Sequence, residues 1–230
     1  MNVLAFDTAT PATVVGLRAG DAPVLARRDE PPAGARPGHA AQLLTLCAEL
    51  LDEAGLTWQD VDRIGVGVGP GTFTGLRIGV ATARALAQAA GAELVGVSTL
   101  ETLGSAAREA TGDAVLAVID ARRGEAFAAG WDAAGTLLHT PAAFAPESLG
   151  ALADPASAPW VAVGDGAIRF RDRLEPAFAA VPDDDSALHR VDADRLCRLT
   201  AEGAVAAREE LVPAYLRLPD AELARRARSA

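Results

Sequence analysis

The expected secondary-structure elements occur in the same order twice, and this repeat limits the possible folds more than any other feature. Hydrophobic periodicity in the first half predicts three strands, a helix, a strand and a helix, followed by one more strand and helix, at residues 2–6, 13–17, 24–28, 39–54, 64–68, 74–90, 93–97 and 98–110. The second half begins again with three strands, a helix, a strand and a helix, at residues 114–120, 125–131, 136–139, 146–152, 160–163 and 191–208. Two βββαβα copies, the second one shortened, predict an α/β fold with two lobes of mixed sheet flanked by helices.

The same patterns predict how the chain is divided. We expect a first lobe over residues 1–110 and a smaller second lobe over residues 111–190. A C-terminal helix and segment over residues 191–218 should pack back on the lobes. Residues 219–230 contain the arginine cluster at 225–228, and we expect a flexible tail there.

Charge and composition exclude several classes of function. The 230 residues carry a formal net charge of −10, and all 21 basic residues are arginines. A chain without lysine has no Walker lysine and no Schiff-base lysine, and an acidic chain is a poor nucleic-acid binder on its own. No apolar run approaches the roughly 18 residues that a membrane span needs. The first residues do not resemble a signal peptide, so we expect a cytoplasmic protein with no membrane partner.

The spacing of cysteine and histidine indicates neither a disulfide framework nor a metal site. Cys47 and Cys197 lie far apart inside helical patterns, where buried and inert thiols are expected. His39, His139 and His189 share no ligand-like spacing. We therefore expect no metal ion to be held by this chain.

Residues 65–79, with the sequence GVGVGPGTFTGLRIG, predict a buried strand, a glycine turn and the start of a helix. Two uses fit this layout, because amides at a helix N-terminus can hold an anion and glycine lets two backbones approach closely. The acid at the end of the first strand fits a phosphate-facing turn or a simple turn carboxylate. The candidate phosphate-loop positions are Asp7, Thr8, Gly69, Gly71 and Thr72.

The helix after this turn carries a stripe of small residues. Gly75, Gly79, Ala83 and Ala87 recur at every fourth position. Glycine in a helix interior costs roughly 0.5–1 kcal/mol relative to alanine, so a close packing contact must offset it. That contact can be internal to the chain or made with another chain, and periodicity leaves both open.

Two segments of the second half are weaker candidates. Residues 120–125 (DARRGE) join two expected strands, and residues 164–166 (GDG) follow a third. Both fit tight turns before they fit a site. The serines lack the G-x-S-x-G context of a hydrolase nucleophile.

Seven segments together resemble those of the bacterial TsaB (YeaZ) proteins, and they occur in that family's order. They are MNVLAFDTAT, the helix over residues 39–51, GPGTFTGLRIG, LVGVSTLETL, DARRGEAF, VGDGA and PAYLR. The resemblance covers nearly the whole chain, and the glycine block is its most specific part. The family belongs to the actin/Hsp70/sugar-kinase (ASKHA) superfamily, whose duplicated lobes agree with the repeat described above.

The resemblance implies a non-catalytic subunit that supports TsaD, together with the ATPase TsaE, in forming N6-threonylcarbamoyladenosine at position 37 of tRNAs that read codons beginning with A. TsaD carries an H-x-x-x-H metal pair, and Thr99 and Leu103 stand at the matching positions here. Neither residue can replace an imidazole as a metal ligand. The resemblance therefore implies no catalytic residue and no cofactor in this chain, with ATP, Mg²⁺ and the metal on partner subunits.

In the family, the first-lobe helices form a helical bundle with TsaD, or with a second copy when TsaD is absent. Carried over to this sequence, the interface residues are Leu43, Leu46, Leu50, Thr74, Gly75, Ile78, Gly79 and Ala83. The closest approach is expected at the small-residue stripe, and the phosphate-loop positions are then vestigial. The tRNA would be reached only through the complex.

Two alternatives remain at this stage. A small ASKHA-type ATPase or kinase acting alone would use Asp7 and the glycine loop, but the second lobe offers only residues 164–166 as an adenosine-binding turn. A metallopeptidase would need paired histidines, which the sequence lacks.

Overall fold

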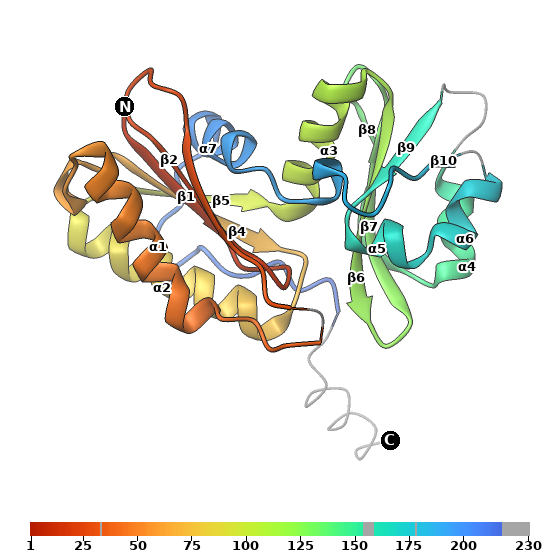
Figure 1. The fold of residues 1–230 in the computed structure, drawn as a ribbon, viewed down its shortest axis with the longest axis horizontal. Coiled ribbons are helices and arrows are strands. Elements are labelled where there is room, and N and C mark those ends of the chain that lie inside the picture. The colour runs from red at the N-terminus through yellow and green to blue at the C-terminus, as the bar shows by residue number, and fades with distance from the viewer. Residues whose placement is uncertain (33, 154–158, 178, 218–230) are drawn as a thin grey trace, which may run out of the picture.

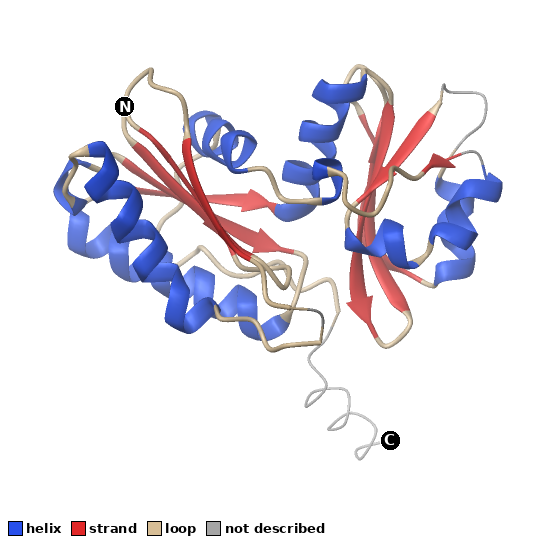
Figure 2. Cartoon of the chain, viewed as in Figure 1, coloured by secondary structure: helices blue, strands red, loops and turns tan. Residues whose placement is uncertain are grey.

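The computed structural model describes residues 1–32, 34–153, 159–177 and 179–217. Within this part the strands form two five-stranded mixed sheets with helices packed against them, which is the α/β architecture that the sequence predicts (Figure 1, Figure 2). The first sheet has the order β3-β2-β1-β4-β5, with β1 (Val3–Asp7), β2 (Thr13–Arg18), β3 (Leu25–Asp29), β4 (Arg63–Gly69) and β5 (Glu93–Ser98). The second has the order β10-β9-β6-β7-β8, with β6 (Ala114–Arg122), β7 (Glu125–Trp131), β8 (Leu137–Phe144), β9 (Trp160–Val163) and β10 (Ala179–Ala180).

The helices alternate with these strands. They are α1 (His39–Ala54), α2 (Phe73–Ala90), α3 (Thr99–Thr111), α4 (Pro146–Leu149), α5 (Asp165–Arg169), α6 (Arg171–Leu174) and α7 (Ala193–Glu202). Short 3₁₀ helices occupy Trp58–Asp60, Gly150–Leu152, Glu175–Ala177 and Ala187–His189. None of the described helices is long and apolar enough to cross a membrane.

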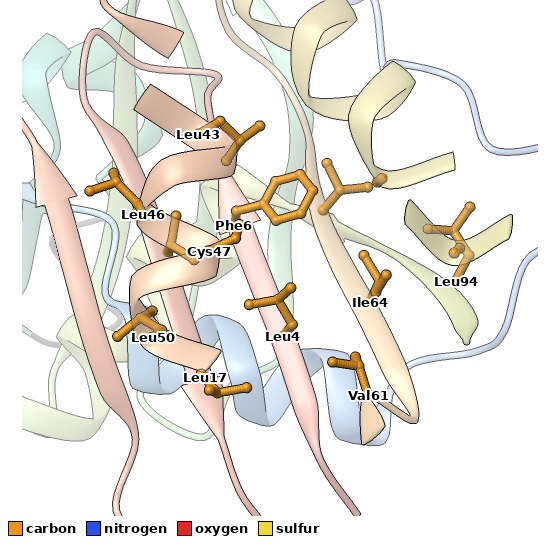
Figure 3. Packing of buried hydrophobic residues seen from close by; sticks show 14 of the residues in the cluster. Leu4, Phe6, Leu17, Leu43, Leu46, Cys47, Leu50, Val61, Ile64 and Leu94 are labelled. Carbon is orange, nitrogen blue, oxygen red and sulfur yellow. The ribbon is translucent and has the colours of Figure 1, made fainter. Parts of the chain in front are cut away.

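Strand β1 shows how the first lobe divides its core between two layers. Leu4 and Phe6 point towards α1 and α2 (Figure 3), whereas Val3 and Ala5 point to the opposite face and pack against Leu196 of α7. Successive side chains of a strand alternate between faces, so a strand covered on both sides is apolar throughout. Each fully buried leucine contributes about 1.5–3 kcal/mol to folding.

Helix α3 packs on the second sheet, although the chain reaches it directly from the first. Leu100, Leu103 and Ala107 share a core cluster with Trp131 of β7. A Cβ atom at Gly104 would lie 2.6 Å from the Trp131 ring, so this helix needs glycine to lie so close to the sheet. The division predicted at residue 110 would place α3 in the first lobe, and the packing corrects it: the chain changes lobes between β5 and α3.

The final helix is shorter than predicted. The pattern predicts a helix over residues 191–208, but α7 begins at Ala193 and ends at Glu202. The side chain of Asp192 caps its first turn by accepting a hydrogen bond from the Arg195 amide at 2.7 Å. Beyond it, the Ala206 amide donates to the Leu94 carbonyl of β5 at 2.8 Å, a bond that a continuing helix could not make.

Residues 203–217 form an extended segment that we call the C-terminal strap. It follows the β5 edge of the first sheet, where Leu211 is buried in the core, and the Ala214 amide then donates to the Val68 carbonyl at 2.8 Å (Figure 1). Leu216 packs against a core cluster that contains Ala12 of the first lobe and Trp131 of the second, and Arg217 pairs with Glu125 of β7 at 2.7 Å. The strap therefore contacts both lobes. Residues 219–230, predicted to be a flexible tail, lie outside the described residues.

Candidate functional site

Asp7 is fully buried where β1, β4 and α3 meet. Its carboxylate accepts hydrogen bonds from the Ala9 amide and the Thr99 hydroxyl, both at 2.7 Å. It occupies the space above Gly67, where a Cβ atom would lie 2.0 Å from Asp7 Oδ2. Burial raises the pKa of the Asp7 carboxyl, while the two hydrogen bonds act in the opposite direction. Thr99, one of the two positions at which the family resemblance implies that a metal ligand is missing, is used to bind Asp7.

The glycine loop is filled by the chain's own backbone. The Thr72 amide donates to the Ala9 carbonyl at 2.8 Å, and a Cβ atom at Gly71 would lie 2.4 Å from that oxygen. At Gly75 a Cβ atom would lie 1.9 Å from the Thr8 carbonyl oxygen. The sequence leaves open whether the loop holds an anion or lets two backbones approach closely. These contacts show a close backbone approach.

The small-residue stripe of α2 faces this same loop. A Cβ atom at Gly79 would lie 2.5 Å from Thr8 Oγ1, which donates to the Gly75 carbonyl at 2.8 Å. Ala83 and Ala87 are buried in the first-lobe core. The prediction that Gly75, Gly79 and Ala83 make the closest approach to another chain is therefore corrected, because the β1–β2 loop and β4 already cover the stripe.

The leucines predicted at the interface also point inward. Figure 3 shows Leu43, Leu46 and Leu50 on the side of α1 that faces the sheet, and all three are buried in the first-lobe core. Thr74 is exposed and faces outward, whereas Ile78 is half-buried and packs against the first-lobe core. The amphipathic pattern counts Leu44 with the apolar face of α1 and puts Leu46 at its rim, but Leu44 is exposed and Leu46 is buried.

A different set of residues forms the outer face of α1 and α2. Leu44 is 51% exposed, which is unusual for a leucine in a helix interior. It lies at the edge of a groove of about 820 Å³ between α1, the 3₁₀ helix at Trp58–Asp60 and α2. The apolar residues lining the groove are Leu44, Ala48, Leu51, Leu56, Trp58 and Leu86. The outward positions of α2 include the exposed alanines Ala81, Ala85 and Ala89.

In the second lobe the structure joins the two weaker candidate segments. Asp165, in the first turn of α5, accepts a hydrogen bond from the Asp120 amide at 3.0 Å. Asp120 in turn binds the guanidinium groups of Arg122 at 3.2 Å and Arg169 at 2.8 Å. Burial raises the pKa of the Asp165 carboxyl. Residues 164–166 are thus the start of a helix rather than an isolated turn.

A pocket of about 260 Å³ lies between the lobes. Thr10 and Arg28 line it from the first lobe, and Asp165, His189 and Arg190 line it from the second. None of the five predicted phosphate-loop positions is among its lining residues.

His189 fixes one wall of this pocket. The Gly164 amide approaches His189 Nδ1 at 3.1 Å, and Nε2 lies 3.1 Å from the Pro182 carbonyl. Nδ1 also lies 3.2 Å from the Gly164 carbonyl oxygen, so residues 164 and 182 hold the ring from its two nitrogens.

Leu103, the second position at which the family resemblance implies that a metal ligand is missing, lies in a buried core cluster with Trp131. Among the described residues, no group of three or more histidine, cysteine or acidic side chains is placed to hold a metal ion. The side chains at Thr99 and Leu103 are a hydroxyl and an alkyl group, which do not fit the imidazole pair of TsaD.

The two mixed sheets have the same strand order, and the β1–β2 loop contacts the glycine loop. These features define the chain as an ASKHA-type α/β protein. The solved structure of the ethanolamine utilization protein EutJ from Carboxydothermus hydrogenoformans shares this fold, with a TM-score of 0.51 at 14% identity over 86% of this chain and 88% of that one. The family model for TsaD, tRNA N6-adenosine threonylcarbamoyltransferase, matches residues 31–223. The chain belongs to the TsaB (YeaZ) family within this TsaD-like group.

Individual relatives agree with that assignment. YeaZ from Pseudomonas aeruginosa has a TM-score of 0.77 and 31% identity, covering 94% of this chain and 99% of that one. The tRNA threonylcarbamoyladenosine biosynthesis protein TsaB of Escherichia coli is 37% identical over 172 residues, which is 72% of each chain. An uncharacterised protein of Mycobacterium tuberculosis is 43% identical over 127 residues, 55% of this chain, and the match spans 57% of that relative's length.

Proposed function

We propose that this chain is a non-catalytic subunit that docks on TsaD and, with TsaE, supports the formation of N6-threonylcarbamoyladenosine at position 37 of tRNAs reading codons that begin with A. The name of the Escherichia coli relative supports the process, since that protein is a tRNA threonylcarbamoyladenosine biosynthesis protein. In this proposal the complex works in the cytoplasm, and two copies of this chain pair when TsaD is absent.

The proposal depends on the apolar side chains that are exposed on the outer face of α1 and α2. A helix pair that packs its leucines on its own sheet would normally present charged side chains to water. Here the outward positions include Leu44 at 51% exposure and the three exposed alanines of α2. Exposed apolar surface of this kind marks a contact site, and a bundle of helices on helices would bury it.

The interior of the chain supports a non-catalytic role. The backbone of the β1–β2 loop occupies the glycine loop, with the Ala9 carbonyl bonded to the Thr72 amide at 2.8 Å. Thr99 is committed to Asp7, and Leu103 to the core. We therefore propose that the chain brings no cofactor of its own and that ATP, Mg²⁺ and the metal are bound by its partners.

Replacing Leu44 by arginine tests the proposed face. Burying this leucine is worth about 1.5–3 kcal/mol, and an arginine would also leave a charge in the interface. We expect Leu44→Arg to weaken co-elution with TsaD of the same organism by at least about tenfold in affinity, while the monomer stays folded. The matched control is Leu138→Arg, because Leu138 lies on β8 of the other lobe and is 44% exposed.

If both variants lost the same affinity for TsaD, or if Leu44→Arg lost none, the α1–α2 face would be rejected as the docking surface. A modification assay with TsaD and TsaE, run with and without this subunit, tests the process itself. The competing function, an ATPase acting alone, predicts micromolar ATP binding by the isolated chain, and that result would overturn the non-catalytic role.

A further inference from the structure

The pocket between the lobes combines charged groups with an apolar wall. Pro11 and Ala12 of the β1–β2 loop line it from the first lobe, and Leu103 of α3 and Ile168 of α5 line it from the second. Its volume of about 260 Å³ lies just below the roughly 300 Å³ at which sites for drug-sized ligands begin. The pocket therefore suits a small metabolite better than a nucleotide.

Most charged side chains of the pocket are already paired. Arg28 binds Glu30 at 3.1 Å, and both of these residues line the pocket. Asp184, a third lining residue, binds Arg171 of α6 at 2.7 Å. One cation and one carboxylate of the lining remain outside these two pairs.

Arg190 is the remaining cation. Its contact with a carboxylate in the described structure is a long one, with Nε 3.7 Å from Glu30, which already binds Arg28 at a shorter distance. Within the described residues the Arg190 side chain donates no hydrogen bond. Its terminal nitrogens are therefore available to a carboxylate ligand, whose two oxygens match the fork of a guanidinium group.

Asp165 is the remaining carboxylate. It accepts a hydrogen bond from the Asp120 amide at 3.0 Å, but it forms no ion pair in the part of the chain that the structure describes. Arg122 and Arg169 bind Asp120 instead. Burial raises the pKa of the Asp165 carboxyl, and a cation bound beside it would offset the cost of that burial. Asp165 therefore fits an ammonium group that the chain itself does not supply.

We propose that this pocket binds a free α-amino acid with a small apolar side chain. The ligand carboxylate meets Arg190, its ammonium group meets Asp165, and its side chain packs against Leu103 and Ile168. A ligand with a single charge would leave one of the two unpaired groups without a partner. None of the lining residues belongs to α1 or α2, so this inference goes beyond the proposed docking role and does not depend on it.

L-Valine is the probe, because two simpler molecules each retain one of its two charges. Isobutylamine lacks the carboxylate and isovalerate lacks the ammonium group, while both keep the branched side chain. Isothermal titration calorimetry of the full chain, without TsaD, TsaE or nucleotide, measures the affinity for each. We expect L-valine to bind with a dissociation constant of about 0.1 mM or lower, and each analogue to bind at least about tenfold more weakly.

Two variants assign the charged contacts. Asp165→Asn keeps an oxygen for the Asp120 amide, and it should weaken L-valine binding at least about tenfold while leaving isovalerate binding unchanged. Arg190→Gln should weaken L-valine binding by a similar factor while leaving isobutylamine binding unchanged. The matched controls are Asp172→Asn and Arg173→Gln, which remove the same charges from an exposed ion pair on α6 outside the pocket and should change no affinity.

Three outcomes would overturn the proposal. L-Valine would fail to bind at millimolar concentration, or one analogue would bind as tightly as L-valine, since the pocket would then recognise a single charge. Alternatively, the two pocket variants would bind L-valine as tightly as the α6 controls do, which would place the amino acid elsewhere.

Circular dichroism on each variant shows whether the fold is retained. Arg190 is exposed, and its side chain donates no hydrogen bond within the described residues, so Arg190→Gln remains decisive even if Asp165→Asn loosens α5. The titrations use the chain alone, so their failure is distinguishable from a failure of Leu44→Arg to weaken co-elution with TsaD.

Discussion

The contact between Gly79 and Thr8 decides whether the small-residue stripe serves the fold or a partner. In the structure a Cβ atom at Gly79 would lie 2.5 Å from Thr8 Oγ1 and 3.4 Å from a Val66 methyl. Alanine at this position must therefore displace the Thr8 hydroxyl and break its hydrogen bond to the Gly75 carbonyl. If the stripe faced a partner instead, Gly79→Ala would be harmless to the isolated chain.

The expected magnitude follows from three opposing terms. Alanine gains about 0.5–1 kcal/mol over glycine in a helix interior. Overpacking a filled core costs about 1–3 kcal/mol, and the lost hydrogen bond costs about 1 kcal/mol more. We expect Gly79→Ala to lower the free energy of unfolding by about 1–3 kcal/mol. Removing the hydroxyl first, in Thr8→Ala, should make Gly79→Ala neutral or stabilising.

A double-mutant cycle measured by urea unfolding separates these terms. The two single variants and the double variant should show a coupling free energy of at least about 1 kcal/mol, because they share one contact. Ala81→Gly, at an exposed position of α2, reports the helix-propensity term alone and should cost about 0.5–1 kcal/mol. Additive effects, or a stabilising Gly79→Ala in the wild-type background, would show that this packing argument is wrong.

Two further predictions concern buried titratable groups. Burial raises the pKa of the Asp7 carboxyl above its ordinary value of 3.8, so its contribution to stability is full below pH 3.8 and is lost as the pH rises through the folded-state pKa. Asp7→Asn should therefore gain stability relative to the wild type across that window in urea titrations, and a difference that does not vary with pH would contradict this. Burial also raises the pKa of Cys47 and Cys197 to about 12, so neither thiol should react with a disulfide reagent at about pH 8 until urea unfolds the chain. Rapid labelling of the native protein would show that a thiol is accessible.

Local patterns predict much of the fold, because they depend on neighbours along the chain. The helix predicted at residues 39–54 has the same bounds as α1, and the strand at 125–131 has the same bounds as β7. The glycine loop lies between a buried strand and a helix, as the sequence predicts. The amphipathic period of α1 and the glycine that ends it are visible in the sequence itself.

Only the tertiary structure shows which segment packs against each helix face. Periodicity shows that α2 has a stripe of small residues but not that Thr8 covers it, since Thr8 lies in the β1–β2 loop, far away in the sequence. Periodicity does not show that Leu44 is left exposed while Leu43, Leu46 and Leu50 pack against the sheet. Tyr215 meets Phe73 only because the strap returns across the first lobe. A sequence pattern records which residues are apolar or small, whereas the partner of each face depends on contacts between distant segments.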